Sequence, residues 1–379
     1  MTKIVFHLGD HKTGSTAIQS TLATKAYQIT GATLLYPQAH RLQHAALART
    51  FTDDEAAGQQ AQRFAEIREE IEAAKPDFAV ISAEHFEEVD PVQLKAAVEK
   101  HLPDHAAGAR YIAYVRPHAD RIASSFAERI KVGSFWGTME EMHVRTLEHG
   151  AFYYAPRFQN WRDTFGPAFE LRPLVRALLT QQDVVADLFS YVLGHQEFTL
   201  GPTGDSNESV SLENLAILGR FQNALRDAGG KKGMYRLALG WALSRRMSAS
   251  AFRNGTKVQM HRDLAETVLQ DYTEDAQALD AAFFTGTPMM DALRAAPGKA
   301  VDVAQSVELA DHYSPREIYL IDLWVDQMAQ IILKDPGYIA RIVREDHRAK
   351  IVAPVDEGKR RAGPGKRGPG GRGRPARQD

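Results

Sequence analysis

The sequence predicts an α/β protein, a three-layer sandwich with a mostly parallel central sheet of about five strands, followed by a helical subdomain. Short apolar runs alternate with helix-like segments over about the first 200 residues, a pattern typical of parallel sheets covered by helices. A glycine-containing loop joins the first apolar run to the first such segment. After about residue 205 long helix-like stretches replace the alternation.

Each strand and helix of the first part is expected from a short pattern. The expected strands are the apolar runs 4–8, 33–36, 78–82, 111–115 and 169–172. The expected helices are 15–25, 56–74, 91–100, 118–131 and 183–192, the second because Phe64, Ile67 and Ile71 recur on one face. Parallel sheets of this kind bind ligands at the carboxyl ends of their strands.

The domain organisation follows from the change in texture. We expect an α/β core over 1–204, a helical subdomain over 205–355 and a disordered basic tail over 356–379. Residues 201–205, Gly-Pro-Thr-Gly-Asp, are the expected junction. The helices expected beyond it are 211–228, 234–247, 261–284 and 315–333, with Ser209 and Ser211 as candidate caps of the first.

Composition excludes several classes of protein. The 379 residues are 44% hydrophobic, enough for one large core or two modest ones. Without cysteine, disulfides and thiolate metal sites are impossible. The histidine pairs 40/44 and 101/105 have helical spacing but no adjacent carboxylate motif, so we read them as solvated faces and predict no metal. No apolar run reaches transmembrane length and the N-terminus leads directly into a strand, which favours a cytoplasmic protein.

Charge is distributed unevenly along the chain. The net charge is −2, yet residues 359–379 hold eight basic residues and only one acidic residue, which leaves the rest near −9. This Gly/Pro/Arg-rich tail lacks the apolar side chains that a core needs. It is either a solubilising tail or a weak contact for a polyanion, without aromatic residues for base stacking.

The loop from His7 to Thr16 is built for an anion. Gly9 and Gly14 allow a tight turn with close backbone approach, and Lys12 supplies a cation. Ser15 and Thr16 can cap the helix that follows. An anion is therefore expected at the N-terminus of this helix.

This loop departs from the common NTP-binding loop in two ways. Its lysine stands two residues before the second glycine rather than after it. The run 78–82 ends in Ser82, and the run 111–115 is followed by Arg116. An aspartate at such a position would help hold magnesium. Both departures argue against a triphosphate–magnesium site.

Residues 11–16, His-Lys-Thr-Gly-Ser-Thr, resemble the 5′-phosphosulfate-binding loop of sulfotransferases that use 3′-phosphoadenylyl sulfate (PAPS). The resemblance is to bacterial, carbohydrate-sulfotransferase-like members, which implies a P-loop-like fold. Arg116 and Ser124, eight residues apart, resemble the 3′-phosphate site of this family; Ser125 is the alternative because the helix phase is open. The resemblance covers about residues 1–200.

The resemblance assigns the site residues. The residues implied for PAPS binding are His11, Lys12, Thr13, Gly14, Ser15, Thr16, Arg116 and Ser124. For catalysis it implies that Lys12 stabilises the leaving oxygen, and that an acceptor base follows the run 78–82. That base is Glu84 or His85, with Glu84 favoured and His7 and His11 as outside candidates. A histidine base would lose activity at higher pH than an unperturbed carboxylate base.

The expected function is transfer of a sulfuryl group from PAPS to a hydroxyl or amine acceptor, with a carbohydrate favoured and no metal required. The alternatives are a nucleotide or sugar kinase, and a noncatalytic nucleotide- or polyanion-binding protein. A set of basic residues in the second half could line a groove for an acidic acceptor. These are Arg220, Arg226, Lys231, Lys232, Arg236, Arg245, Arg246, Arg253 and Lys257.

Overall fold

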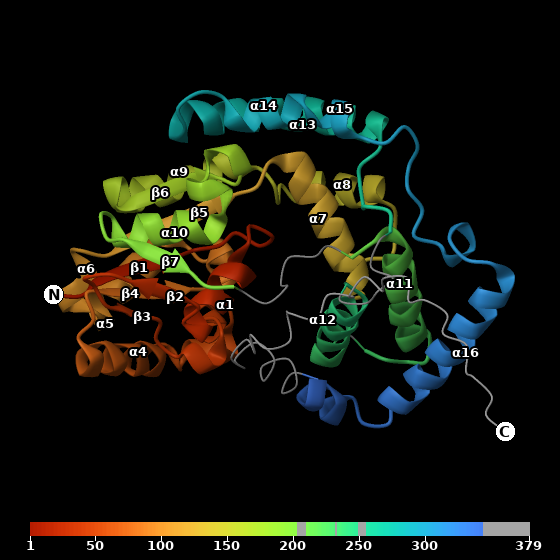
Figure 1. The fold of residues 1–379 in the computed structure, drawn as a ribbon, viewed down its shortest axis with the longest axis horizontal. Coiled ribbons are helices and arrows are strands. Elements are labelled where there is room, and N and C mark those ends of the chain that lie inside the picture. The colour runs from red at the N-terminus through yellow and green to blue at the C-terminus, as the bar shows by residue number, and fades with distance from the viewer. Residues whose placement is uncertain (203–209, 232, 249–254, 344–379) are drawn as a thin grey trace, which may run out of the picture.

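A five-stranded parallel sheet forms the centre of the protein in the computed structural model, which describes residues 1–202, 210–231, 233–248 and 255–343. Its strands lie in the order β3-β4-β1-β5-β6 (Figure 1). They span Leu34–Leu35, Phe78–Ser82, Lys3–His7, Arg110–Val115 and Phe169–Pro173, respectively. Every neighbouring pair is parallel. The α/β class and the parallel five-stranded sheet predicted from the sequence are confirmed.

The strand order places a crevice at β1. The chain runs from β1 to β3 and β4 on one side, and then crosses to β5 and β6 on the other side. Phe6 is therefore opposite Ile81 of β4 and Tyr111 of β5. In open parallel sheets, ligands bind where such a reversal leaves a crevice outside the carboxyl ends of the strands.

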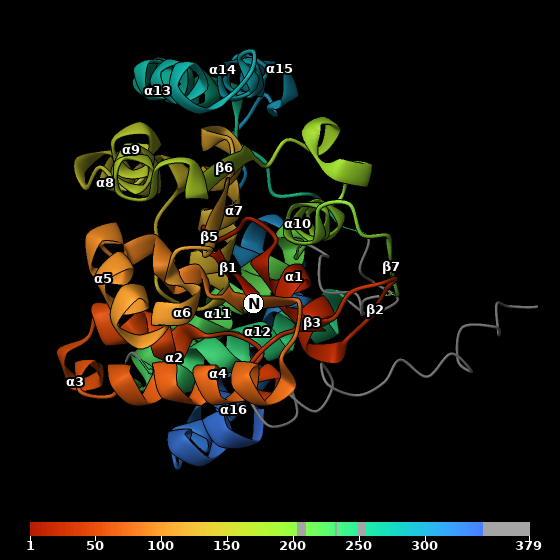
Figure 2. The same ribbon diagram turned by 90° about the vertical axis from the view of Figure 1, so that its left-hand side faces the viewer.

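Helices cover both faces of the sheet, as Figure 2 shows along the strands. The side chain of Val5 packs on one face with α1 (Ser15–Thr24) and α10 (Val184–Leu193). The alternate residue Phe6 points to the other face, where α4 (Gln60–Ala74), α5 (Pro91–His101) and α9 (Tyr154–Phe165) pack. The result is the expected three-layer sandwich.

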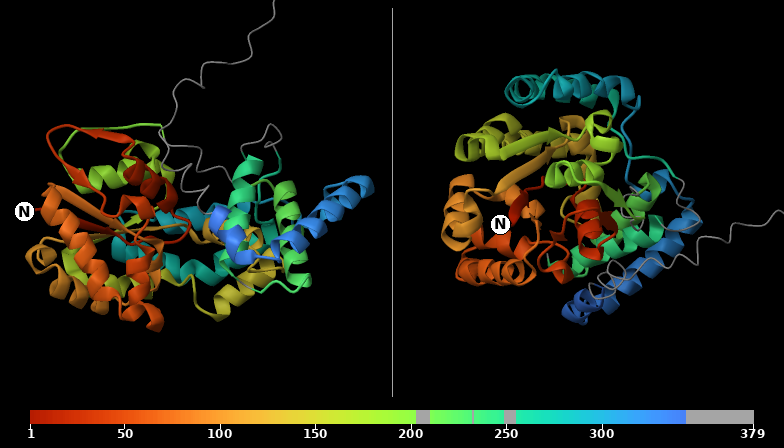
Figure 3. Two further views of the ribbon diagram at one scale, coloured as in Figure 1. Left: turned by 90° about the horizontal axis from the view of Figure 1, so that it is seen from below. Right: turned by 60° about the vertical axis from the view of Figure 1, so that its left-hand side comes forward.

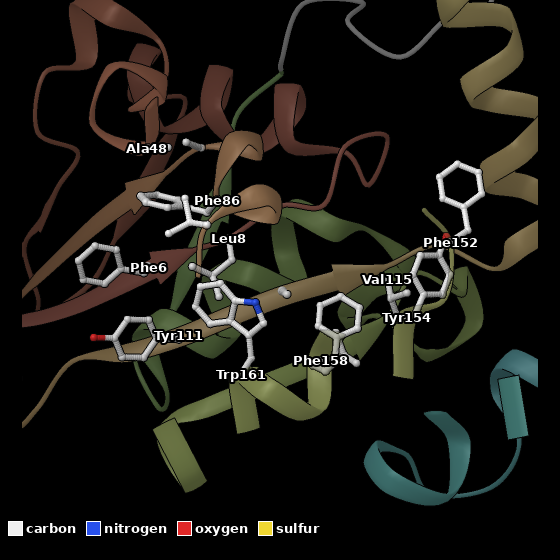
Figure 4. Close-up of a cluster of buried hydrophobic side chains, with 14 of the residues drawn as sticks. Phe6, Leu8, Ala48, Phe86, Tyr111, Val115, Phe152, Tyr154, Phe158 and Trp161 are labelled. Carbon is white, nitrogen blue, oxygen red and sulfur yellow. The ribbon is translucent and has the colours of Figure 1, made fainter. Parts of the chain in front are cut away.

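An aromatic cluster fills the second face close to the strand ends (Figure 4). The rings of Phe6 and Tyr111 stack with centroids 5.2 Å apart, and Phe86 meets Phe6 edge-on. Phe86 lies in the single helical turn Glu84–Glu88 that follows β4. Because this turn is anchored in the core, the residues beside it at the strand end are fixed in place.

The later helices form two groups. Helices α13 (Arg262–Phe283) and α14 (Pro288–Arg294) share the core of the sheet's second face, and Figure 1 shows them above α9. Helices α11 (Leu212–Asp227), α12 (Met234–Ser248) and α16 (Pro315–Ile332) have a separate core around Leu225 and Leu239. Helix α7 (His118–Lys131) connects the sheet to this second group.

A buried acid fixes the first group to the sheet. Asp275 of α13 lies 2.9 Å from the Nε2 atom of His118 at the start of α7. It also accepts hydrogen bonds from the backbone amides of Tyr154 and Ala155 at the start of α9. A carboxylate at the N-terminus of α9 is favourable because it accepts otherwise unpaired amides.

Most predicted elements start and end within a residue or two of the observed ones, and several elements were not predicted. The segment 56–74 is two helices, α3 (Asp54–Ala57) and α4. Also missed were α8 (Met139–Glu148), α9, α14 and the antiparallel pair β2 (Tyr27–Ile29) and β7 (Phe198–Leu200). The described residues also form the short α-helices α2 (Ala45–Ala48), α6 (Pro103–Ala106) and α15 (Ala296–Lys299).

Two local predictions have clear outcomes. Ser211 caps α11 by accepting a hydrogen bond from the Asn214 amide, whereas Ser209 and the tail 356–379 lie outside the described residues. The reading of His44 as solvated is wrong: it is buried, and the Ser82 amide donates to its Nδ1 atom. No helix among the described residues is long and apolar enough to span a membrane.

Candidate functional site

A cavity of about 1730 Å³ lies at the carboxyl ends of β1, β4 and β5. One wall is the loop after β1 with the turn after β4, and the other wall comes from α7, α12, α15 and the segment 257–260. Nine of the ten predicted site residues line it: His11, Lys12, Gly14, Ser15, Thr16, Glu84, His85, Arg116 and Ser124. Thr13 does not line it, because its buried hydroxyl donates to the Asp10 carbonyl.

The two glycines of the loop are required by its shape. Gly9 has φ of +95°, and a Cβ there would lie 3.1 Å from the Glu84 backbone. Gly14 has φ of +88°, and a Cβ there would lie 2.7 Å from the Val184 side chain. At either position, a residue with a side chain would be strained by the positive φ and would also be too close to this neighbour. The close approach at Gly9 brings Glu84 next to the loop.

The predicted cap of α1 is wrong. Gly14 is the N-cap residue, and no side chain of the described residues caps this helix. The Ser15 hydroxyl turns back to the Asp10 carbonyl at 3.3 Å instead. The first turn of α1 therefore faces the cavity without a side-chain acceptor, which suits an anionic ligand.

Three arginines from two later helices and a strand end hold this loop. Arg157 of α9 forms a two-pronged ion pair with the buried Asp10, with N–O distances of 2.8 and 2.5 Å. Arg121 of α7 donates to the His11 carbonyl and to Glu87. Arg116 donates to the Lys12 carbonyl at 3.1 Å. The guanidinium fork suits such paired contacts and fixes the loop geometry.

Lys12 projects towards α7. Its ammonium lies 2.9 Å from the Oε2 atom of Glu128, which also binds the Lys131 ammonium at 2.6 Å. The Trp241 indole of α12 donates to Oε1 of the same carboxylate. Burial opposes ionisation of Glu128, but Lys12 and Lys131 outweigh it and lower its pKa to about 2. Glu128 thus joins the loop, α7 and α12, a role that the sequence analysis missed.

The two candidate bases have different partners. Glu84 lies with Oε2 2.9 Å from the Nδ1 atom of His11. Burial opposes the charge on both, but the pairing wins, so the Glu84 pKa is lowered and the His11 pKa is raised. His85 lies beside Arg49, with an N–N distance of 3.5 Å, and beside the His11 ring.

The pKa of His85 differs from the value expected for a histidine base. Burial, with the charges of His11 and Arg49, lowers the pKa of His85 to about 4. A base at His85 would therefore stay deprotonated at as low a pH as a carboxylate. The pH dependence of the rate cannot separate Glu84 from His85 in the way that unperturbed pKa values predict.

The structure fixes which face of α7 lines the cavity beside Arg116. Arg116 follows β5, and burial lowers its pKa. Ser124 lines the cavity on α7, whereas Ser125 is buried away from it. Of the two serines that the sequence left open, Ser124 is the one that can contact a ligand beside Arg116.

The cavity is positively charged although the chain is weakly negative. Nine lysines and arginines line it against four carboxylates, Glu84, Asp120, Glu128 and Asp183. The basic residues are Lys12, Arg41, Arg49, Arg116, Lys131, Arg176, Arg245, Lys257 and Lys299. A concave surface of one sign concentrates ligands of the opposite sign.

Only part of the predicted basic groove faces this cavity. Arg245 and Lys257 line it. Arg220 instead binds Asp322 and Asp326, Arg226 lies over the Trp136 ring and Arg236 is buried against Gln222. Lys231 and Arg246 are not part of the lining, and Lys232 and Arg253 lie outside the described residues.

Comparison with known proteins gives one structural relationship to report. No family model and no curated protein matches the chain. Among solved structures, it is similar to a sulfotransferase from Alicyclobacillus acidocaldarius, with 13% sequence identity and a TM-score of 0.38. The alignment covers 78% of this chain and 99% of that chain. The chemistry of the site therefore has to be inferred from its own residues.

Proposed function

We propose that this protein is a PAPS-dependent sulfotransferase that transfers a sulfuryl group to a hydroxyl or amine acceptor, with a carbohydrate favoured. The observation that supports this most is the meeting of three groups in one positive cavity. These are the loop of Lys12, the pair Arg116 and Ser124, and the neighbours Glu84 and His85. They match a cradle for one phosphate, a site for a second phosphate and a base.

Each residue has a distinct role in this proposal. The first-turn amides of α1 and Lys12 bind the 5′-phosphosulfate, and Arg116 with Ser124 binds the 3′-phosphate. As the acceptor oxygen bonds to sulfur, the bond from sulfur to the phosphate oxygen breaks, and its electron pair stays on that oxygen. Lys12 stabilises the charge that develops there. The base takes the proton of the acceptor.

Glu84 is the favoured base, and its contact with His11 supports this assignment because it holds the carboxylate in place. The His11 imidazole holds Oε2 at 2.9 Å, which fixes the carboxylate and leaves Oε1 to accept a proton. His85 remains the alternative base, since it lines the same wall of the cavity.

The decisive test uses 3′-phosphoadenosine 5′-phosphate (PAP), which carries the 3′-phosphate that ATP lacks. We expect PAP to raise the melting temperature and Arg116→Ala to abolish this shift, because each charged hydrogen bond to a phosphate contributes about 1.5–3 kcal/mol. Arg262→Ala is the matched control, since Arg262 lies on α13 in an exposed ion pair with Asp302.

Two results would contradict the proposal. If ATP with magnesium stabilises the protein as well as PAP does, the 3′-phosphate assignment is wrong and the kinase alternative gains support. If PAP binds but radiolabelled sulfate is not transferred to any of a panel of saccharide, phenolic and lipid acceptors, the noncatalytic nucleotide-binding alternative is preferred.

A further inference from the structure

Helix α16 presents an unusually apolar face to solvent. Val325, Ala329 and Ile332 are buried against the α11 and α12 core. The rest of the helix surface carries large apolar side chains, with Tyr319 and Trp324 each 66% exposed and Leu323 53% exposed. Exposed with them are Leu320, Met328 and Ile331. Figures 1 and 3 show α16 at the outer edge, far from the sheet.

The size of this face distinguishes it from scattered surface residues. At about 150–250 Å² for a large apolar side chain, the six residues together expose on the order of 600 Å². That equals or exceeds the largest apolar patch on a typical monomer, at about 300–600 Å². It also approaches the roughly 800 Å² that each partner buries in a stable interface.

The charges at the two ends of α16 indicate what covers it. Arg316 and Glu317 lie at its N-terminal end, and Lys334 and Asp335 follow its C-terminal end. If two copies of the helix pack antiparallel, each end carrying Arg316 and Glu317 meets the end carrying Asp335 and Lys334. Both ends then gain opposite-charge pairs. Parallel packing would place Arg316 at the level of Arg316 and Glu317 at the level of Glu317 in the second copy, so it does not form these pairs.

The same register aligns the apolar residues. With Arg316 at the level of Asp335 in the second copy, Leu320 lies at the level of Ile331. The two side chains are on the same side of the helix at 3.6 residues per turn. Because the two-fold axis repeats each contact, the Leu320–Ile331 pair forms twice.

Two other occupants fit less well. An anionic membrane prefers a helix whose apolar face is edged by lysine and arginine, whereas Asp322 and Asp326 lie along one edge of this face and are bound by Arg220. The segment 344–379 has few large apolar side chains, with Ile351, Val352 and Val355 as its aliphatic residues beyond alanine and proline. It cannot bury six large side chains.

We infer that α16 is a dimerisation surface on which a second copy of this chain packs antiparallel, with Leu320 of each copy against Ile331 of the other. The surface is distinct from the cavity, so this inference does not depend on the proposed function.

The test measures the mass of the full chain by sedimentation over a range of concentrations. Wild type should form a dimer, and Leu320→Glu or Ile331→Lys alone should weaken it by about 100-fold or more, because each places two unpaired charges in an apolar interface. Mixing the two variants should restore a heterodimer, since the glutamate introduced in one chain then faces the lysine introduced in the other.

Val92→Glu is the matched control, because Val92 is an exposed residue of α5 at the opposite end of the molecule. It should leave the dimer unchanged, and circular dichroism should show that all variants fold. A monomeric wild type, a dimer that tolerates Leu320→Glu, or a mixture that fails to reassociate would each overturn the inference. If the protein stays monomeric but binds anionic phospholipid vesicles through α16, a membrane surface is the occupant.

Discussion

The two walls of the cavity are built differently. On the sheet side, buried ion pairs behind the lining hold the loop after β1: Asp10 is 1% exposed and paired with Arg157, and Arg121 of α7 is 5% exposed and paired with Glu87. On the helical side, Glu128 of α7 is held by Lys12, Lys131 and Trp241, but Lys257 and Lys299 are exposed. The loop is pre-organised, whereas the part of the second wall that carries Lys257 and Lys299 can adapt to what it binds.

The two parts of the cavity differ in how precisely they must place a ligand. Burying an ion pair costs desolvation, so such pairs contribute less to stability than to holding one geometry. A loop that must direct backbone amides and Lys12 at a reacting centre needs that precision. A surface that only attracts an anion from solution does not, because screened charges act without fixed positions.

The largest expected effect tests the sheet-side wall. Glu84→Gln keeps the size and hydrogen bonding of the side chain but removes its basicity, so kcat should fall by about 10²–10⁴ while PAP affinity changes little. His85→Asn should cost less in the same sulfuryl-transfer assay. Full turnover in Glu84→Gln together with an inactive His85→Asn would reverse the two roles.

The pH dependence of this rate identifies a third possibility. A base must be deprotonated, and the pKa of Glu84 is lowered and that of His85 is about 4. Activity that rests on either should persist well below neutral pH. His11 has a raised pKa, so a rate that already declines at a higher pH than Glu84 or His85 would allow would assign proton acceptance to His11.

The next effect concerns the rigidity of the same wall. Arg157→Met retains the aliphatic length but leaves Asp10 as a buried carboxylate without its partner, so the free energy of unfolding should fall by about 3–5 kcal/mol. Thermal or urea unfolding measures this. The control Arg262→Met removes the exposed pair with Asp302 and should cost less than about 1 kcal/mol. Equal losses would show that Arg157 does not hold the loop.

The sequence predicted the elements around the loop but not the contacts that hold it. The strands 78–82 and 111–115 and the helix 118–131 were predicted because their apolar pattern is local. The partners of the loop are distant in sequence: Glu128 is 116 residues from Lys12 and Arg157 is 147 residues from Asp10. Such pairs depend on how α7 and α9 pack, which no local pattern records.

Some features that were not predicted could have been recognised in the sequence. Helix α8 begins with a capping box between Thr138 and Glu141, a pattern that is readable from sequence alone. The choice between Ser124 and Ser125 needed the phase of α7, which is set by burial of Ile122 and Phe126. The assumed cap at Ser15 was wrong because the loop turns its hydroxyl back to Asp10. The residue that caps α1 could not be predicted without knowing the conformation of the loop.

The smallest expected effect tests the adaptable wall. If Lys257 and Lys299 only attract an acceptor, Lys257→Ala and Lys299→Ala should each raise the KM for an anionic acceptor by no more than about fivefold, since an exposed charge contributes up to about 1 kcal/mol. The increase should vanish at high salt and be absent with a neutral acceptor, while kcat and PAP affinity stay constant. Lys100→Ala on α5, outside the cavity lining, is the matched control. A loss of kcat in either variant would mean that the helical wall also positions the acceptor, and the contrast between the two walls would not hold.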